Sequence, residues 1–218
     1  MNAKSHELAR GFVDADEDRA KKRGYLRWLP ATGTALDVGC GTGVLLDVLH
    51  EAGFAPRGID SDPIAVAACR ARGHAVEAAD LHDALARLAA AGARFDAVAL
   101  VHVIEHFDGE RGLLLLERAA AVLAPGGTLL VVTPEFRSAI QREETFWLDP
   151  SHVRPYPRAL LERALSSNGL SIVASLGDPA SIPRRPVWKR CLARVRDALA
   201  GVDRSGPMDA VVIARRTP

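Results

Sequence analysis

Apolar and polar positions alternate along the middle of the chain in two patterns. Short apolar runs predict buried strands, and longer segments whose apolar residues recur every three or four positions predict helices. The expected strands are 34–38, 55–59, 75–78, 95–101 and 128–133, and the helices between them are 44–52, 63–71, 83–91 and 110–123. Strands and helices that alternate in this way form a parallel sheet with right-handed crossovers. The pattern therefore predicts a doubly wound α/β fold with helices on both faces of the sheet.

The alternation stops after Pro134. An irregular stretch is expected up to residue 157, followed by a helix over 158–167 and by two strands over 170–176 and 210–215. Two strands that end the chain with a long connection between them suggest an antiparallel pair at one edge of the sheet.

The beginning of the chain is charged and carries a few apolar residues. It predicts a helix over 5–28, which ends before Pro30 because proline lacks the amide proton that a helix interior uses. A length of 218 residues suits one full domain with a buried core. We therefore expect an N-terminal helical cap and a single domain with two decorations, with these bounds: cap 1–30, domain 31–218, acceptor-side loop 135–157 and basic helical insertion 179–207.

The composition is that of an ordinary globular protein, because 48% of the residues are apolar and 25% are charged. The formal net charge of +1 is too small for a general nucleic-acid-binding protein, which normally presents a strongly basic face. The 3 cysteines show neither a zinc-binding nor a disulfide spacing, which favours the reducing cytoplasm. The N-terminal segment lacks the apolar core of a signal peptide, and no apolar run reaches the roughly 18 residues of a membrane span. Neither secretion nor a membrane-spanning segment is expected.

Residues 36–43 read Leu-Asp-Val-Gly-Cys-Gly-Thr-Gly, so a predicted strand ends in a glycine-rich turn before a helix. Such a turn lets a ligand approach the backbone, and the helix N-terminus offers amide groups to a carboxylate or another anion. By itself the turn suits a nucleotide-type site or a merely tight connection. Val44 replaces the third glycine of the dinucleotide fingerprint, and Asp37 would repel a pyrophosphate. S-adenosylmethionine has no phosphate and carries an ammonium and a sulfonium, which a carboxylate attracts.

Acidic residues also follow the next two predicted strands. Asp60 ends the second strand, where a carboxylate can accept two hydrogen bonds from a ribose diol. The alternative for Asp60 is a helix cap, a role that Asp62 before Pro63 fits better. Asp80 follows the third strand and can accept from an adenine amino group or cap the next helix, although Asp83 can also serve as that cap.

Four segments in order resemble the successive motifs of class I S-adenosylmethionine-dependent methyltransferases. They are residues 36–43, 58–60 (Gly-Ile-Asp), 95–98 (Phe-Asp-Ala-Val) and 123–128 (Leu-Ala-Pro-Gly-Gly-Thr). The resemblance implies a Rossmann-like, mostly parallel seven-stranded sheet with the last strand antiparallel, and S-adenosylmethionine bound at the carboxyl ends of the strands. The cofactor-binding residues expected on this basis are Asp37, Gly39, Cys40, Gly41, Gly43, Asp60, Ser61, Asp80, Leu81 and His102.

A His-x-x-Glu-His segment over 102–106 follows the fourth predicted strand. Its spacing coincides with an inverted zinc-protease motif, but that motif needs a long helix and this segment ends a buried strand. Methyltransferases that resemble this chain carry a similar Glu-His pair beside the transferred methyl group, which implies that His102 approaches the cofactor or acceptor and that Glu105 and His106 shape the pocket. In quinone-pathway O-methyltransferases the comparable cluster is associated with a divalent metal, although their first acidic position is His102 here. We expect no metal, and the alternative is a polar cluster that only caps the strand.

The stretch over 135–157 gathers aromatic residues, a histidine and charges in a long loop, and a loop of this kind in a compact domain is usually functional. We expect it to form the acceptor pocket, and residues 146–155 resemble a motif of glycan-pathway methyltransferases whose acceptor is a sugar hydroxyl. Methyl transfer needs alignment and removal of the hydroxyl proton. His152 or His106 is the candidate base, with Asp149 to orient it. The alternative for His152 is a hydrogen-bonded loop anchor.

The connection over 179–207 is basic, and its apolar residues recur at helical spacing, which predicts an amphipathic helix. Such a helix usually packs on its domain with the charges in solvent. The alternative is peripheral contact of residues 184–199 with a membrane surface or an anionic acceptor.

These observations predict a cytoplasmic S-adenosylmethionine-dependent methyltransferase that acts on a hydroxyl of a small-molecule or sugar/glycan acceptor and produces S-adenosylhomocysteine. A quinone or natural-product acceptor is the second choice, because a fold does not determine the acceptor. A non-catalytic cofactor-binding module and a nicotinamide oxidoreductase are the rival functions. The sequence does not predict an oligomeric state.

Overall fold

The structure is a computed structural model that describes residues 15–182, 192, 195, 199 and 206–218. Its centre is a seven-stranded sheet in the order β3-β2-β1-β4-β5-β7-β6. The strands are β1 (Gly33–Val38), β2 (Phe54–Asp60), β3 (Ala75–Ala78), β4 (Phe95–Val101), β5 (Leu123–Pro134), β6 (Leu170–Gly177) and β7 (Asp209–Arg216). Strands β1 to β5 pair in parallel, and β7 is inserted antiparallel between β5 and β6. The doubly wound fold and the antiparallel pair at its edge are confirmed.

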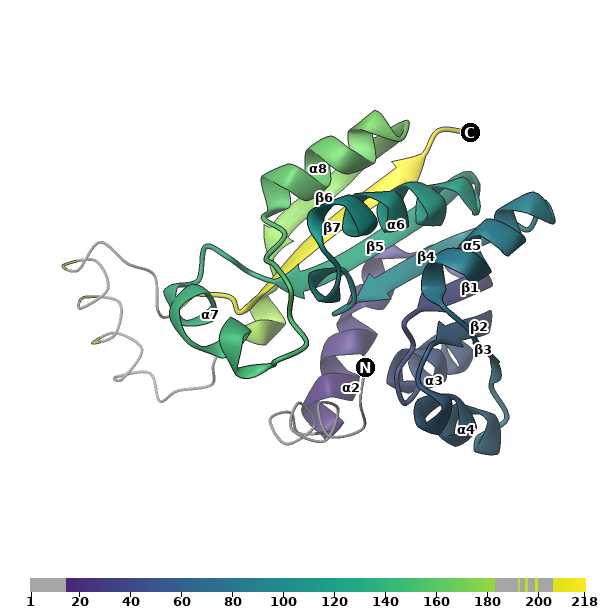
Figure 1. Cartoon of the computed structure of the whole chain (residues 1–218), viewed down its shortest axis with the longest axis horizontal. Helices are drawn as coiled ribbons and strands as arrows, with labels where there is room; N and C mark the ends of the chain where they lie inside the picture. The colour runs from purple at the N-terminus through teal and green to yellow at the C-terminus, as the bar shows by residue number, and fades with distance from the viewer. Residues whose placement is uncertain (1–14, 183–191, 193–194, 196–198, 200–205) are drawn as a thin grey trace.

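Helices cover both faces of the sheet (Figure 1). One layer contains α2 (Ala15–Tyr25), α3 (Val44–Glu51) and α4 (Pro63–Ala71), and the other contains α5 (Leu81–Ala90), α6 (Gly109–Ala121) and α8 (Arg158–Ser167). Successive residues of the central strands enter opposite layers, so that Leu36 packs with the α5, α6 and α8 layer and Ala35 with the α2 and α3 layer. Because both faces are buried, the central strands are mostly apolar.

The strand order reverses between β1 and β4, since β2 and β3 lie on one side of β1 and the later strands lie on the other. In doubly wound folds, ligands bind outside the carboxyl ends of the strands at such a reversal. The glycine turn after β1 and the His-x-x-Glu-His segment after β4 therefore lie at the same edge of the sheet, where we look for the site.

The boundary at β5 differs from the expectation. The sequence predicted a helix to residue 123 and a strand from residue 128, whereas β5 already begins at Leu123. The register shifts between the Phe95–Leu123 pair and the Ala97–Thr128 pair. Gly126 has φ +74°, and a Cβ on Gly127 would lie 2.8 Å from the carbonyl oxygen of Ala124. Pro125, Gly126 and Gly127, which in the sequence suggest a loop between a helix and a strand, thus form an irregular part of β5.

The long connection from β5 to α8 is also more regular than expected. It contains a short helix α7 (Ala139–Glu143) and a 3-10 turn η3 (Thr145–Leu148). Three further 3-10 turns are η1 (Leu26–Trp28) after α2, η2 (Ile104–His106) after β4 and η4 (Pro179–Ser181) after β6, and η2 carries two residues of the site described below. The part of the N-terminal helix expected over 5–14 and most of the basic insertion, including Arg184, Arg185, Trp188, Lys189, Arg190, Arg194 and Arg196, lie outside the described residues. Within the described ranges, none of the helices has both the length and the apolar character needed to cross a bilayer.

Candidate functional site at the carboxyl ends of β1 and β4

The glycine turn adopts a backbone that other residues reach only with strain. Gly39, Gly41 and Gly43 have φ values of +76°, +50° and +80°. A Cβ on Gly39 would lie 2.6 Å from Cγ2 of Val103, and one on Gly43 would lie 2.8 Å from Sγ of Cys69. Side chains at positions 39 and 43 would therefore clash with buried neighbours and force the turn to move. The glycines were expected to serve a ligand, and the structure shows that they also let the turn pack on the residues behind it.

Asp60 holds the glycine turn at the end of β2. Its Oδ2 accepts a hydrogen bond from the amide of Gly41 at 2.7 Å, and its Oδ1 accepts from the amide of Asp62 at 2.8 Å. The cap of α4 is Asp62, whose Oδ1 accepts from the amide of Ile64 at 2.9 Å, as the sequence favoured. A carboxylate can accept about four hydrogen bonds, so Asp60 keeps capacity for a ribose diol at the mouth of the turn.

Asp37 is a buried carboxyl group directly below the turn, with an exposed fraction of 2%. Burial raises its pKa to about 7, although the charge of Lys22 on α2 works in the opposite direction, and Asp60 adds to the rise. A buried carboxyl group with a raised pKa gains most from a cationic ligand, because the ligand compensates the charge that burial disfavours.

The other expected cofactor residues lie around the same edge. Asp80 caps α5, because its Oδ1 accepts from the amides of His82 at 2.9 Å and of Asp83 at 3.2 Å. Its role toward adenine stays a prediction, and its Oδ2 lies 3.6 Å from the guanidinium of Arg111. Of the remaining three, Cys40 and Leu81 are buried and Ser61 is exposed.

His102 follows the last residue of β4 in a strained conformation. Its φ of +56° makes it the one non-glycine residue with a positive φ in the described part of the chain. Such strain costs about 1–3 kcal/mol and concentrates at functional sites. Its Nδ1 lies 3.2 Å from Oε1 of Glu105, and its Nε2 lies 3.7 Å from Oδ1 of Asp209. Burial opposes protonation of the ring, but these two carboxylates outweigh it and raise the pKa of His102 above its ordinary value.

Glu105 connects this segment to the acceptor-side loop. Its side chain is fully buried, and its Oε2 accepts from the hydroxyl of Thr133 at 3.1 Å. Its main-chain oxygen accepts from the amide of Val153 at 2.8 Å, which places the 135–157 segment against the end of β4. Burial alone would raise the pKa of the carboxyl group, but the hydrogen bond and charge of His102 lower it below its ordinary value. Glu105 is therefore a buried anion with neighbours that keep it charged.

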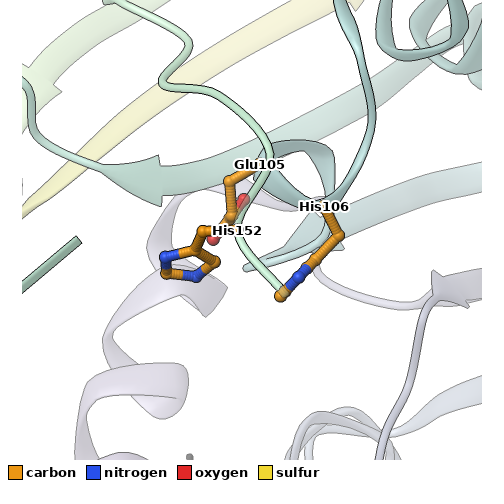
Figure 2. A group of neighbouring side chains, drawn as sticks. All are labelled: Glu105, His106 and His152. Carbon is orange, nitrogen blue, oxygen red and sulfur yellow. The ribbon is translucent and has the colours of Figure 1, made fainter. Parts of the chain in front are cut away.

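His106 and His152 lie beside Glu105, although they come from different segments (Figure 2). Nδ1 of His152 lies 2.7 Å from the main-chain oxygen of Phe146, and Nδ1 of His106 lies 3.2 Å from that of Ser151. The ring centroids are 5.0 Å apart. A carbonyl oxygen can only accept, so each Nδ1 is assigned the proton and each Nε2 carries the lone pair.

Asp149 was expected to orient the base. Its Oδ2 lies 3.9 Å from Nε2 of His152, which is too long for a hydrogen bond. Its Oδ1 accepts from the hydroxyl of Ser151, and that hydroxyl oxygen lies 3.0 Å from Nδ1 of His106. The amide of Ser151 also donates to Oδ1 of Asp149 at 2.8 Å, and the two hydrogen bonds from Ser151 lower the pKa of Asp149, against the effect of burial. Asp149 thus supplies a charge near His152 and contacts His106 through Ser151, while the backbone of Phe146 orients His152.

Glu105, His106 and His152 each offer one ligand-type atom, and these atoms lie within 4.8 Å of one another. Two imidazoles beside a carboxylate can hold a metal ion or transfer a proton. The residue types alone therefore admit both chemistries, and the expectation of a metal-free site stays a prediction.

Comparison with known proteins identifies the family. A family model described as a methyltransferase domain matches residues 13–175. The chain belongs to this family. The methyltransferase is 32% identical over 142 residues to a probable S-adenosylmethionine-dependent methyltransferase of Mycolicibacterium smegmatis, with 65% of this chain and 53% of the relative covered. It is 31% identical over 159 residues to a ubiquinone biosynthesis O-methyltransferase of a Methylobacterium species, with coverages of 66% and 62%. The methyltransferase therefore spans between half and two thirds of the length of these relatives.

Solved structures show that the methyltransferase has the class I fold. A SAM dependent methyltransferase from Archaeoglobus fulgidus matches with a TM-score of 0.79 at 20% identity, and the match covers 99% of this chain and 100% of that one. Magnesium protoporphyrin IX methyltransferase from Synechocystis, solved with bound SAM, matches with a TM-score of 0.59 at 16% identity, covering 93% and 78%. Together with the family match, they show that the chain contains a methyltransferase domain with this fold.

Several residues that complete this site were absent from the sequence prediction. The hydroxyl of Thr133 donates to Glu105, and the hydroxyl of Ser151 donates to Asp149. Asp209 on β7 faces His102, and Lys21 on α2 pairs with Asp209. Only Ser151 carried a signal, since it lies between Asp149 and His152 in the loop that was expected to form the acceptor pocket.

The raised pKa of Asp37 predicts that cofactor binding by the methyltransferase weakens in acid. With Asp37 assigned to the ammonium of the cofactor, as proposed below, a carboxyl group that is mostly neutral below pH 7 attracts the ligand less, so the dissociation constant should be up to about tenfold larger at pH 6 than at pH 8. Isothermal titration of S-adenosylhomocysteine at both pH values measures the change. The Asp37→Asn variant should bind more weakly and lose this dependence. An unchanged pH dependence in that variant would assign the effect to another group.

The same shift affects stability. The folded protein binds the proton of Asp37 more tightly than the unfolded chain does. The stability that this proton contributes is fully present below the ordinary carboxyl pKa and is lost as the pH rises through about 7. The cofactor-free Asp37→Asn variant should therefore melt at a higher temperature than the original protein at pH 8.

Proposed function

We propose that this protein transfers the methyl group of S-adenosylmethionine to a hydroxyl group of a small-molecule acceptor. The observation that carries the proposal is the imidazole pair of His106 and His152 beside the buried Glu105, at the edge of the sheet that also holds the glycine turn. An acceptor hydroxyl must lose its proton when it attacks the methyl group, and an imidazole can take that proton near neutral pH.

The geometry around β1 and β2 supports the cofactor half of the proposal. The cofactor supplies a methyl group on a positively charged sulfur. We assign Asp37 to the ammonium of the methionine moiety and Asp60 to the ribose diol. The amides after the glycine turn fit the carboxylate, because a helix N-terminus attracts negative charge. Asp80 and Leu81 are assigned to the adenine side at the start of α5.

His152 is the base that the contacts favour. Its Nδ1 is bound to a carbonyl oxygen, which leaves Nε2 as the nitrogen that can accept a proton. The Asp149 carboxylate at 3.9 Å has a lowered pKa and stays ionised, so it stabilises the imidazolium that forms. His106 and Glu105 then form the wall of the acceptor pocket. In this proposal the proton passes from the acceptor oxygen to Nε2 of His152.

A phenolic hydroxyl suits this base better than a sugar hydroxyl. The pKa of a phenol is about 10, whereas the pKa of a neutral aliphatic hydroxyl is closer to the value of about 15.7 for water, so an imidazole removes the phenolic proton more readily. Three of the curated relatives are ubiquinone biosynthesis O-methyltransferases. These observations support a phenolic or quinone-like acceptor, whereas the sugar acceptor is supported by the sequence resemblance of residues 146–155.

The proposal is tested by measuring S-adenosylhomocysteine formation with phenolic, quinone-like and glycan acceptors. With the acceptor that works best, His152→Ala should lower kcat by about 100-fold or more, as expected for loss of a general base, and leave the dissociation constant of the cofactor within twofold of its original value. His50→Ala is the matched control, because His50 is an exposed histidine on α3.

Two outcomes would contradict this proposal. If His152→Ala keeps full kcat at every pH, His152 is only an anchor of the loop. If the protein binds the cofactor but methylates none of the acceptor classes, a non-catalytic cofactor-binding module is favoured.

A further inference from the structure

The N-terminal helix α2 reaches the carboxyl end of β4 through Lys21. Lys21 on α2 forms an ion pair with Oδ2 of Asp209, the first residue of β7. Both side chains are largely buried, with exposed fractions of 19% for Lys21 and 5% for Asp209. Asp209 is opposite Pro134 at the end of β5, so this ion pair lies at the same edge of the sheet as the carboxyl end of β4.

Asp209 also faces the strained histidine. Its other oxygen, Oδ1, lies 3.7 Å from Nε2 of His102, and Nδ1 of the same ring lies 3.2 Å from Oε1 of Glu105. Lys21, Asp209, His102 and Glu105 therefore form a row of side chains from α2, β7, the end of β4 and η2. Charges alternate along this row when His102 is protonated.

The row explains how the strained His102 keeps its position. Its side chain is 38% exposed, so packing alone does not enclose it. The carboxylate of Glu105 is within hydrogen-bond distance of one ring nitrogen, the carboxylate of Asp209 attracts the other from 3.7 Å, and Lys21 holds Asp209 in turn. Glu105 in turn accepts the main-chain hydrogen bond from Val153 that places the acceptor-side loop.

Attachment of α2 does not require this buried pair. Arg23 binds Glu51 of α3 at 3.0 Å, Arg19 contacts Asp47 at 3.6 Å, and the hydroxyl of Tyr25 donates to Asp178 at 3.0 Å. Burying an ion pair often contributes little net stability, because both ions lose their hydration. The attachment of α2 by these other contacts leaves the position of the Lys21–Asp209 pair beside His102 to be explained.

We propose that Lys21 and Asp209 are positioning residues for methyl transfer, which act through His102 to hold Glu105 and the acceptor-side loop in place. The inference rests on the proposed function, because it assumes that methyl transfer occurs beside Glu105. It makes α2 a wall of the active site, whereas the sequence predicted only a helical cap. Lys21 and Asp209 touch neither of the assigned cofactor carboxylates, Asp37 and Asp60, and the proposal places His102 on the acceptor side, so the two residues should affect turnover and leave cofactor affinity unchanged.

The first test compares two ion pairs of α2, the one made by Lys21 and the one made by Arg23. Lys21→Ala should lower kcat by about tenfold or more and leave the cofactor dissociation constant within twofold, and Lys21→Arg should restore kcat to within about threefold. Arg23→Ala removes a contact between α2 and α3 that involves none of the four side chains of the row and should leave kcat within twofold. Equal losses in Lys21→Ala and Arg23→Ala would reduce Lys21 to a structural contact and overturn the proposal.

A double variant tests whether Lys21 acts through His102. Asparagine tolerates the left-handed backbone, so His102→Asn removes the ring and keeps the turn. Adding Lys21→Ala to His102→Asn should lower kcat by less than twofold further. Losses that multiply would show that Lys21 acts by another route and would contradict the proposal.

A spectroscopic measurement separates this inference from the proposed function. In the protein saturated with S-adenosylhomocysteine and without any acceptor, the NMR signals of the His102 ring should shift in Lys21→Ala and Asp209→Asn but not in Arg23→Ala. Unshifted signals would overturn the positioning role. Shifted signals in a protein that methylates no acceptor would support the contact and reject the proposed function instead.

Discussion

Replacing Asp60 with alanine is expected to weaken S-adenosylmethionine binding by about 100-fold or more. Two hydrogen bonds from a ribose diol to a carboxylate are each worth about 1.5–3 kcal/mol, and their sum corresponds to two to four orders of magnitude in the dissociation constant. The variant also loses the hydrogen bond that holds the amide of Gly41 at 2.7 Å, which loosens the glycine turn. Isothermal titration of the cofactor measures the effect.

The neighbouring Asp62 provides a matched control. It caps α4 through the amide of Ile64, so Asp62→Ala should lower the free energy of unfolding by about 1 kcal/mol and leave cofactor affinity within twofold. Asp60→Asn keeps an oxygen that can accept from Gly41 but removes the charge, and it should bind the cofactor with intermediate affinity. If Asp60→Ala binds the cofactor normally, the assignment of Asp60 to the ribose is wrong.

Replacing Glu105 with alanine is expected to have the second large effect, on both stability and turnover. The free energy of unfolding should fall by about 2–3 kcal/mol, which is below the usual cost of removing one partner of a buried ion pair because His102 is part-exposed and keeps Asp209. The hydroxyl of Thr133 also loses its acceptor. Chemical denaturation measures this loss. The kcat should fall at least 100-fold, because the acceptor-side loop and both histidines lose the side chain around which they are arranged.

Glu105→Gln distinguishes charge from shape. The amide keeps an oxygen for Thr133 and fills the same space, so stability should recover by more than half while kcat stays at least tenfold below its original value. Full activity in Glu105→Gln would show that the negative charge at this position is dispensable. Cofactor affinity should be unchanged in both variants, since Glu105 lies on the acceptor side of the site.

Local patterns in the sequence determined the β1–turn–α3 unit and the order of strands and helices. The glycines of residues 39–43 appear where the backbone needs positive φ values, and Asp62 precedes the proline that begins α4. Both features depend only on residues that are close in the chain, so they can be predicted without knowledge of the tertiary structure. The start of β5 was missed, because its proline and glycines resemble a break unless the register with β4 is known.

The arrangement of the acceptor side was decided only by tertiary structure. His106 and His152 are 46 positions apart, and they meet because the main chain of Glu105 binds Val153. Asp209 and Lys21 come from opposite ends of the chain and meet because β7 is inserted beside β5 while α2 packs across the same edge. No local pattern encodes such contacts, since they depend on the order of strands in the sheet. The sequence by itself thus determined the glycine turn and the order of the elements, whereas the fold determined which side chains gather at the carboxyl end of β4.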